Sequence, residues 1–319
     1  MVVATWNRAG RLPRVVGALS HQVDAPPFEL VVVDDGSTDD TPSVLASLAR
    51  EATFPIRVVR LDANAGPAAA RNAGWRAARA DLVAFTDDDC WADPGWVAAL
   101  ASGLEGADVV QGRTLADPDA VGRDWFSHTI EVLYERGHYE TCNIAYRRRW
   151  LEAAGGFDEG FRSSGGRGGP IYGEDTDLAW RVKGLGATTA FCDGAVVTHE
   201  VRPRTFLDLL RSLPRREGVV MVVRRHPGVR ATFPGGWWYQ EPHGPALLVL
   251  VGAALVLSGP RSPIRWALAA LCACPYLWVR TRGWPMRYRI VMLPRMFAFD
   301  VGEVAVLAWA SVKHRTLVL

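Results

Sequence analysis

Short apolar runs alternate with helix-like segments through the first 120 residues, and this alternation limits the fold more than any other feature. The apolar runs have the length of strands, and the segments between them carry apolar residues spaced three and four apart. Because alternating strands and helices form right-handed βαβ units, the pattern predicts a largely parallel α/β sheet. Strands are expected at residues 1–5, 28–35, 56–62 and 81–89, and helices at 11–22, 37–51 and 66–79, the second helix with a Ser or Thr N-cap.

Acidic residues follow three of these strands at the point where each strand ends. Asp34 and Asp35 close the second strand, Asp62 closes the third, and the run from Asp87 to Asp89 closes the fourth. Adjacent carboxylates repel one another, so a fold gains nothing by collecting them unless they hold something. Parallel α/β sheets bind their ligands beyond the carboxyl ends of the strands. The sequence therefore predicts a ligand site at this edge of the sheet.

Asp87 and Asp89 form a D-x-D pair whose carboxylates can converge on one divalent cation. Carboxylate oxygens suit Mg²⁺ or Mn²⁺, and such an ion keeps positions open for phosphate oxygens. The alternative is a polar turn that caps the following helix. However, Asp93 offers itself as that cap, with Pro94 at the first helical position. We therefore interpret the triple aspartate as a metal site.

Two motifs later in the chain add candidate functional groups. His199 ends a short strand; such a His is more often structural, but beside a D-x-D it becomes a candidate metal ligand. Glu174 and Asp175 open a helix, where an acidic pair also favours the helix dipole. Because they follow the Gly-rich stretch 163–169, a closing loop would deliver a carboxylate to the site. Asp175 is then the candidate general base.

Several functional classes are not supported by the sequence. The G-x-G-x-x-G pattern is missing after the first strand, and so is the P-loop pattern, so nothing supports nicotinamide or P-loop chemistry. The net charge is +2, from 36 basic and 34 acidic residues, which gives no electrostatic case for a nucleic-acid partner. The five cysteines form no C-x-x-C pair, which is typical of reduced thiols in a cytosol.

The C-terminal part of the chain differs in character. Residues 245–259 and 266–279 contain no charge. As helices these runs would be about 21–23 Å long, less than the roughly 30 Å of the hydrocarbon layer. The last segment, 289–315, mixes apolar and charged residues in an amphipathic pattern. We expect a membrane-associated helical hairpin with interfacial helices; the alternative is an apolar subdomain packed on the core or on a second copy.

Taken together, the motifs resemble those of the inverting glycosyltransferases of family 2, which have a GT-A fold. The resemblance is carried, in this order, by TWNR, VVVDDGSTDDT, NAGPAAARNAG, FTDDDC, GGFDEGF, GEDTDLAWR and VTHE. It implies a Rossmann-like, mainly parallel sheet flanked by helices. The expected domains are a catalytic domain at 1–203, with a nucleotide-binding half at 1–105 and an acceptor half at 106–203, a linker with amphipathic helices at 204–244, and an apolar tail at 245–319.

The resemblance implies that a sugar passes from a nucleotide-sugar donor to a hydroxyl acceptor, with Mn²⁺ or Mg²⁺ on the donor diphosphate. The expected donor contacts are Thr5, Trp6, Asp35, Asp62, Asn64, Arg71, Asp87 and Asp88. The expected metal ligands are Asp89, Asp87 and His199. Asp175 is the expected base, with Glu174 beside it on the acceptor side. The Q-x-x-R-W motif of processive members is absent, so a single addition is expected.

The tail resembles the membrane-associated ends of bacterial members that act on lipid-linked or cell-envelope glycans. Basic residues flank it at Arg224, Arg225, Arg230, Arg280, Arg282, Arg287 and Arg289. By the positive-inside rule, we expect the enzyme on the cytoplasmic face of the cell membrane.

Two other functions compete with glycosyl transfer. A nucleotidyltransferase acting on a sugar phosphate would need a basic, Gly-rich loop after the first strand, and NRAGRLP is a poor version of one. A non-catalytic sugar-binding scaffold is expected to have lost Asp89 or Asp175, and both are present.

Overall fold

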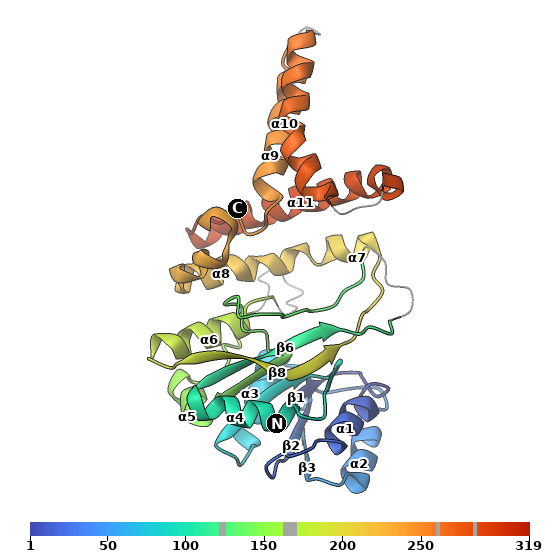
Figure 1. Ribbon diagram of the computed structural model, residues 1–319, viewed down its shortest axis with the longest axis vertical. Coiled ribbons are helices and arrows are strands. Elements are labelled where there is room, and N and C mark those ends of the chain that lie inside the picture. Colours follow the sequence, from blue (N-terminus) through green and yellow to red (C-terminus); the bar gives the residue numbers. More distant parts are fainter. Residues whose placement is uncertain (121–125, 162–170, 260–261, 283–285) are drawn as a thin grey trace. The chain divides into compact units, whose positions relative to one another are not determined.

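The computed structural model describes residues 1–120, 126–161, 171–259, 262–282 and 286–319 (Figure 1). The chain forms two compact units, Met1–Arg204 and Thr205–Leu319. The candidate catalytic motifs all belong to the first unit, and the two apolar runs belong to the second. Each unit is described by itself.

The first unit is built on an eight-stranded sheet with the order β3-β2-β1-β4-β7-β6-β8-β5. The first four strands are parallel to one another. This half confirms the predicted βαβ units, whose strand ends meet at one edge of the sheet. The strands are β1 (Val2–Thr5), β2 (Leu30–Asp34), β3 (Ile56–Arg60), β4 (Leu82–Asp87), β5 (Cys90–Ala92), β6 (Val109–Ala116), β7 (Asn143–Arg147) and β8 (Thr189–His199).

The other half of the sheet corrects the expectation of a mainly parallel sheet. β7 runs antiparallel to both β4 and β6, and β5 runs antiparallel to β8, while β6 and β8 are parallel. Antiparallel neighbours need no helical crossover between them. The helix-poor segment that follows β6 therefore returns the chain as β7 without a βαβ unit. The sheet as a whole is mixed.

Helices cover both faces of this sheet (Figure 1). Along β2 the side chains alternate between the two cores, Leu30 and Val32 on one face and Val31 and Val33 on the other. The first core is closed by α1 (Leu12–Ser20), α2 (Thr41–Glu51) and α4 (Trp96–Gly106); the second by α3 (Pro67–Ala77), α5 (Arg148–Ala154) and α6 (Glu174–Gly184).

Two predicted helix caps are wrong. α2 begins at Thr41 after Asp40, and Ser37 is used elsewhere, because its hydroxyl accepts the Asn7 N–H. α4 begins at Trp96 after Gly95, so Asp93 does not cap it with its carboxylate. The Asp93 carbonyl instead accepts the Trp96 N–H at 3.0 Å in the turn before the helix.

The second unit is helical. Its helices are α7 (Phe206–Arg211), η1 (Leu213–Arg216), α8 (Glu217–Arg225), η2 (Pro227–Thr232), η3 (Pro234–Gly236), α9 (His243–Leu257), α10 (Pro263–Thr281) and α11 (Met286–His314). α9 and α10 pack closely, since a Cβ on Gly252 would lie 3.0 Å from the Ala269 Cα. Among the described residues, no helix is both long and apolar enough to span a membrane.

Buried acids join α9 and α10 to α11. Asp300 accepts hydrogen bonds from the Tyr276 hydroxyl at 2.7 Å and from Arg280 Nε at 2.8 Å. Glu303 pairs with His243, whose Nε2 lies 2.9 Å from its Oε2. Both acids are almost fully buried. The base of the helical pair is therefore fixed by ion pairs, because a buried carboxylate is stable only when it is paired.

Asn143 holds the mixed half of the sheet to α4. Its amide Nδ2 donates to the carbonyls of Arg113 and Ala195, and its Oδ1 accepts the Trp96 indole N–H, each at 2.8 Å. The Asn143 side chain that makes these three hydrogen bonds is fully buried. Gly112 makes room for it, because a Cβ there would lie 2.4 Å from the Asn143 amide.

We predict that Asn143→Ala lowers the free energy of unfolding of the first unit by about 2–4 kcal/mol, because it leaves a buried indole N–H and two carbonyls unpaired. Hydrogen exchange with peptide resolution would show faster exchange in β6 and β8. Asn64→Ala, at an exposed position, is the control. Equal exchange in the two variants would contradict the prediction.

Candidate active site

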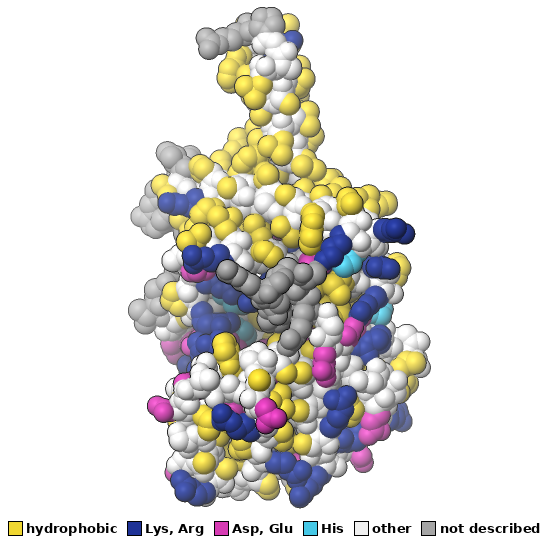
Figure 2. Space-filling view, turned by 180° about the vertical axis from the view of Figure 1, so that it is seen from behind, with side chains coloured by type: hydrophobic (Ala, Val, Ile, Leu, Met, Phe, Trp, Pro, Cys, Tyr) yellow, Lys and Arg dark blue, Asp and Glu magenta, His cyan; other side chains and the backbone are white. Residues whose placement is uncertain are grey.

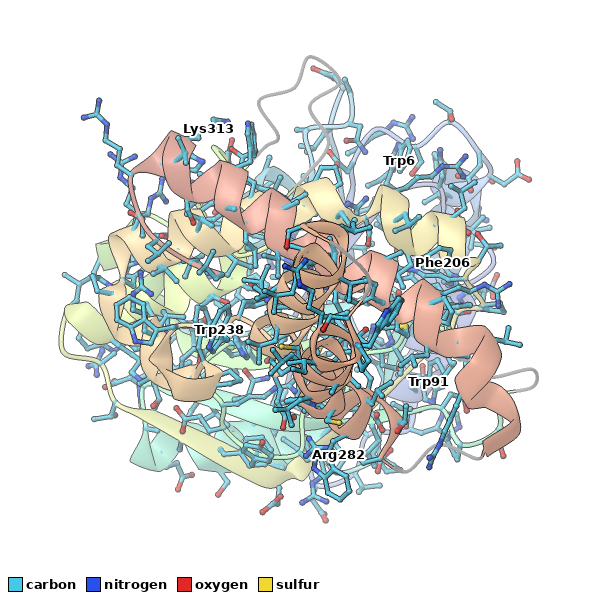
Figure 3. All side chains as sticks on the ribbon, turned by 90° about the horizontal axis from the view of Figure 1, so that it is seen from above. Trp6, Trp91, Phe206, Trp238, Arg282 and Lys313 are labelled. Atoms are coloured by element: carbon cyan, nitrogen blue, oxygen red, sulfur yellow. The ribbon has the colours of Figure 1, made fainter. Side chains whose placement is uncertain are left out.

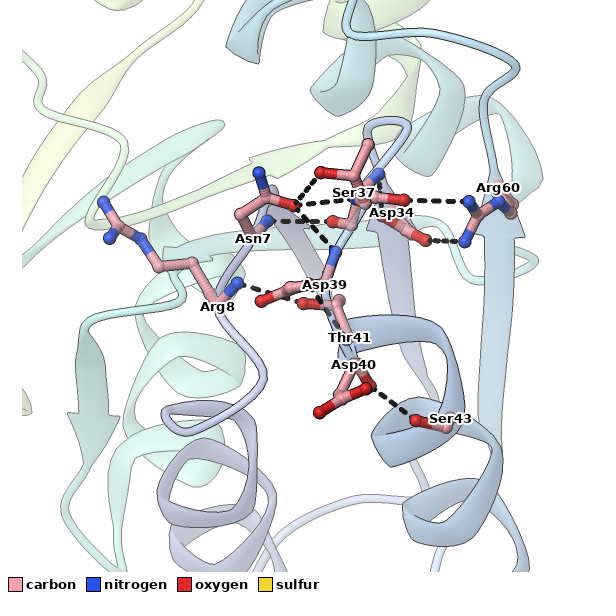
Figure 4. Close-up of polar contacts among 10 residues, drawn as sticks. Asn7, Arg8, Asp34, Ser37, Asp39, Asp40, Thr41, Ser43 and Arg60 are labelled. Carbon is pink, nitrogen blue, oxygen red and sulfur yellow. Dashed lines mark hydrogen bonds and ion pairs between the residues drawn. The ribbon is translucent and has the colours of Figure 1, made fainter.

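The loop after β2 is fixed by a polar network at the carboxyl edge of the sheet (Figure 4). Asp34 accepts the Ser37 N–H at 2.9 Å and pairs with Arg60 at 2.7 Å. Asn7, which follows β1, accepts the Thr38 N–H through Oδ1 at 2.8 Å. The fully buried Asp34 therefore supports the loop.

Asp35 joins the same loop to the start of α3. Its two oxygens accept the N–H groups of Ala65 and Gly66, at 2.7 and 2.8 Å. Gly36 allows this approach, because its φ is +69° and a Cβ there would lie 2.7 Å from the Ala63 carbonyl carbon. Both Asp35 oxygens are therefore used by the backbone, and a contact with a nucleotide base stays a prediction.

The other expected nucleotide contacts lie around this loop. Trp6 follows β1, and 49% of it is exposed (Figure 3). Asp62 and Asn64, between β3 and α3, are also exposed. Within the described residues these two side chains make no hydrogen bond or ion pair. Thr5 is buried and donates its hydroxyl proton to Asp88 at 2.8 Å, so its side chain is already engaged.

The three consecutive aspartates turn to three different partners. Asp87 accepts from Arg71 at 2.9 Å. Asp88 accepts from Thr5, and Asp89 lies 3.2 Å from the Arg202 guanidinium. Among the described residues, the atoms gathered for a metal ion belong to Asp89, Cys90 and His199. Asp87 is not in this group, and its role as a second carboxylate ligand stays a prediction.

Arg71 joins the carboxyl edge of the sheet to the start of α6. Its guanidinium pairs with Asp87 on one side and, at 3.0 Å, with Glu174 on the other. Gly173, with φ at +116°, turns the chain into α6. A buried Arg needs such compensating carboxylates, and each of them needs the Arg. This ion-pair chain brings Asp175, the next residue, toward the triple aspartate.

The pKa of Asp175 is raised, and its role as a base stays a prediction. Burial, followed by the neighbouring Glu174 carboxylate, raises the pKa of Asp175 to about 8. Its only hydrogen bond within the described residues is accepted from the Thr176 N–H at 2.8 Å. A carboxylate with a pKa near the working pH takes up a proton readily. Burial and the charge of Asp89 similarly raise the pKa of Asp88 to about 7.

The pairing of β5 with β8 brings Asp89 and His199 together. Cys90 lies opposite His199 in the antiparallel register, and the Glu200 N–H donates to the Asp89 carbonyl at 2.9 Å. His199 Nδ1 lies 2.7 Å from the Glu200 carbonyl, which can only accept, so Nδ1 carries the proton. In the neutral ring, Nε2 then presents a lone pair to Asp89 Oδ1, 3.6 Å away. Two acceptors facing each other suit a cation between them, so these residues fit a divalent metal.

Sequence reasoning missed two arginines at this edge. Arg202 pairs with Asp89, and Arg8 lies 3.9 Å from Asp88. Arg202 follows His199 by three residues. This spacing does not indicate a contact with Asp89, because the contact arises only when β8 pairs with β5. Both side chains bring positive charge to a carboxylate-rich edge and suit contacts with a phosphate group.

The Gly-rich stretch 163–169, expected to act as a lid, lies outside the described residues. Residues on either side of it line a small cleft of only about 10 Å³, the space of one water molecule. Glu159, Phe161 and Glu174 face this cleft, together with the start of α3. Glu174 thus both pairs with Arg71 and lines this cleft, and its role on an acceptor side stays a prediction.

Comparison with known families and proteins identifies the family of the chain. The family described as Glycosyl transferase family 2 matches residues 1–163. The chain is 32% identical over 225 residues to validoxylamine A glucosyltransferase of Streptomyces hygroscopicus subsp. limoneus, covering 58% of this chain and 48% of that protein. It is 26% identical over 246 residues to hyaluronan synthase of Pasteurella multocida, covering 64% and 24%. The chain thus spans a quarter to a half of these relatives.

Solved structures share the fold. The mannosyltransferase PcManGT from Pyrobaculum calidifontis, in complex with GDP-Man and Mn²⁺, matches with a TM-score of 0.63 and 20% identity, over 98% of this chain and 86% of that one. TarS 1-349 of S. aureus, in complex with UDP-GlcNAc, matches with a TM-score of 0.53 and 16% identity, over 99% and 91%. A third curated relative, 30% identical over 162 residues, is the undecaprenyl-phosphate 4-deoxy-4-formamido-L-arabinose transferase of Yersinia enterocolitica, covering 48% and 50%.

We predict that Glu174→Gln lowers the pKa of Asp175, because it removes the carboxylate charge beside it and frees Arg71 to act on it. The ¹³C carboxyl shift of Asp175, identified by difference from Asp175→Asn, would report the titration. Glu152→Gln, at an exposed position on α5, is the control. An unchanged or higher pKa in Glu174→Gln would contradict the assignment.

Proposed function

Because the chain belongs to glycosyl transferase family 2, we propose that its first unit transfers a sugar from a nucleotide-sugar donor to a hydroxyl acceptor, with inversion and one sugar at a time. One observation carries the proposal: Asp175, with a pKa near 8, follows a Glu that Arg71 links to the triple aspartate. The ion pairs of Arg71 link the start of α6 to carboxylates that could hold the metal ion of a diphosphate donor. Relatives named as glycosyltransferases support the same reaction.

Asp175 takes the proton of the acceptor hydroxyl as the hydroxyl oxygen attacks the anomeric carbon. The bond from that carbon to the diphosphate oxygen breaks, and the nucleoside diphosphate leaves from the opposite face. Glu174 has two effects on this step. Its charge keeps the proton affinity of Asp175 high, and its bond to Arg71 fixes the start of α6.

The donor end is assigned to the carboxyl edge of β1, β2 and β4. The nucleoside lies by Trp6 and the loop that Asp35 holds, and Arg8 and Arg202 bring positive charge for the diphosphate. Asp89 and His199 would hold Mn²⁺ or Mg²⁺, with Asp87 as a further carboxylate, as the Mn²⁺ in the PcManGT complex suggests. Such an ion supplies charge stabilisation to the departing diphosphate.

The two rival functions have weaker support. A nucleotidyltransferase needs free N–H groups and basic side chains after β1 to hold a triphosphate. Here the N–H groups of Asn7 and Arg8 are already donated to Ser37 and Thr41. A non-catalytic scaffold has no use for a carboxyl group with a pKa near 8, such as that of Asp175. Nor does it need the ion pair between Arg71 and the neighbouring Glu174. Glycosyl transfer uses both features.

We expect the purified chain to release one nucleoside diphosphate from a panel of UDP-, GDP- and dTDP-sugars in the presence of Mn²⁺, and not in EDTA. Asp175→Asn should lower turnover by about 10²- to 10⁴-fold, because a positioned base contributes that much, while donor binding is kept. Asp89→Ala should weaken donor and metal binding. Asp193→Asn, on the exposed part of β8, is the control. Full turnover in Asp175→Asn would remove the base assignment.

We further propose that the second unit attaches to lipid through α9 and α10, on the cytoplasmic face of the membrane, where a lipid-linked or cell-envelope acceptor would be met. α9 has no polar side chain after His243, and a helix that is apolar all round needs an apolar environment. Figure 2 shows apolar side chains over this helical pair. Its large exposed side chains are Leu248, Leu250, Val251, Leu255, Leu257, Ile264, Trp266, Leu268, Leu271, Leu277 and Trp278.

The basic residues at the base of this pair are partly neutralised. Arg280 pairs with Asp300 and Arg282 with Glu241. Attachment should therefore depend on apolar contact more than on anionic lipid, since only unpaired cations gain from a negative surface.

In a flotation assay we expect the chain to rise with vesicles of neutral phospholipid. The triple variant Leu257→Asp, Trp266→Asp and Trp278→Asp should stay in the dense fraction, because each aspartate would have to enter an apolar layer. Val23→Asp, at an exposed apolar residue of the first unit, is the control. If the wild-type chain does not float and is a dimer by light scattering that the triple variant abolishes, the pair binds a second copy instead.

A further inference from the structure

Cys90 is a buried thiol that the proposed reaction does not use. It follows the triple aspartate directly, begins β5 and is fully buried. In the antiparallel pairing with β8 it lies opposite His199. Its Sγ, one Asp89 oxygen and one His199 ring nitrogen all lie within 4.8 Å of one another. A thiol, an imidazole and a carboxylate in one group are the ligand types of a zinc site.

The Asp89 oxygen and the His199 nitrogen already lie at the separation expected for two ligands of one small ion. In a tetrahedral zinc site with bonds of about 2.0–2.3 Å, ligand atoms lie about 3.3–3.7 Å apart. His199 Nε2 and Asp89 Oδ1 are 3.6 Å apart. In the neutral ring, the Nδ1 contact with the Glu200 carbonyl places the proton on Nδ1, which is the tautomer that binds a metal through Nε2. Within the described residues, Nε2 makes no hydrogen bond.

The second Asp89 oxygen is held on another side. Its Oδ2 lies 3.2 Å from Arg202, so Oδ1 can bind an ion without breaking that pair. The Cys90 thiol lies against Cys142, whose Sγ is 3.6 Å from the Thr114 hydroxyl. The Cys90 sulfur already lies within 4.8 Å of the other two ligand atoms.

We propose that Asp89, Cys90 and His199 together form a site for a thiophilic divalent cation, Zn²⁺ or its spectroscopic substitute Co²⁺. The proposal rests on the proposed function in one respect: Asp89 and His199 are also assigned to the Mn²⁺ or Mg²⁺ of the donor. The thiophilic ion therefore competes with the donor metal for two shared ligands, and Cys90 decides the preference.

The coordination is balanced in charge. The Cys90 S–H bond breaks, the proton goes to solvent, and the sulfur lone pair binds the ion. The 2+ charge then meets one carboxylate and one thiolate, so the ion and its three ligands together carry no net charge. The fourth tetrahedral position stays open for water or a phosphate oxygen. No oxidant or reductant is involved.

The consequence is inhibition by zinc at a site built for a harder ion. Thiolate and imidazole favour Zn²⁺ over Mg²⁺ and Mn²⁺, both by ligand softness and by the general order of affinity for divalent metals. Without Cys90, the pair of Asp89 and His199 would prefer Zn²⁺ much less. The thiol thus sets how strongly this protein discriminates between metals.

The test is a Co²⁺ titration of the full chain in reducing, oxygen-free buffer, followed by absorption. We expect about one equivalent to bind, with visible bands of four-coordinate Co²⁺ and a near-ultraviolet band from thiolate-to-metal charge transfer. The charge-transfer band should be absent in Cys90→Ser and Cys90→Ala. It should remain in Cys192→Ser, a half-buried cysteine on β8 whose thiol contacts the Ala99 carbonyl.

Two further variants guard against misfolding and against the wrong thiol. His199→Gln should weaken Co²⁺ binding at least tenfold, and Cys142→Ala should keep the charge-transfer band. Circular dichroism would check that each variant is folded. A wild-type spectrum without the charge-transfer band, or a band kept in both Cys90 variants, would overturn the proposal. So would a band that disappears only in Cys142→Ala.

Competition separates this proposal from the proposed function. Zn²⁺ should displace bound Mn²⁺, seen by its electron paramagnetic resonance signal, at least tenfold more effectively in the wild-type chain than in Cys90→Ser. Neither this measurement nor the Co²⁺ spectrum uses turnover. A Co²⁺ site in a chain without transferase activity would remove the proposed function alone, whereas transferase activity without a Co²⁺ thiolate band would remove this proposal alone.

Discussion

Compensation of crowded carboxylates at one edge of the sheet is the interaction on which the first unit depends. Buried carboxylates at strand ends would repel one another and unfold the edge if they stood alone. Each has its own partner instead. Asp34 pairs with Arg60, Asp87 with Arg71 and Asp89 with Arg202. Asp35 is stabilised instead by hydrogen bonds from two backbone N–H groups.

This compensation is incomplete at two positions, and the carboxyl groups there have raised pKa values. Burial raises the pKa of Asp175 and of Asp88, because neither has a full ion-pair partner. The edge therefore combines structural ion pairs with groups available for chemistry, and Arg71 connects the two kinds through its bonds to Asp87 and Glu174.

The second unit differs from the first in that it has excess apolar surface. Two of its buried acids, Asp300 and Glu303, serve as anchors between helices and are paired with Arg280, Tyr276 and His243. Beyond that base, α9 and α10 cover each other on one side only, and the remaining faces stay exposed. Exposed apolar surface of this kind indicates a partner of the same polarity.

The sequence by itself determined the parallel half of the sheet, because the alternation of strands and helices is local and repeats. It also determined that acids lie at the strand ends, since parallel strands end at a common edge. The order of the motifs indicated the family. None of this required knowing which distant residues meet. The mixed half was not predictable, because a strand such as β7 looks the same in either direction.

Only the tertiary structure decided which partner each acid takes. Arg71 and Glu174 are 103 residues apart, and Asp89 meets His199 and Arg202 only because β5 pairs with β8 in one register. A shift of one residue would turn Cys90 and His199 to opposite faces. Sequence spacing carries no information about such pairings, because they depend on packing between elements. The types of residue at the site could therefore be predicted from the sequence, whereas their partners and proton affinities depend on the fold.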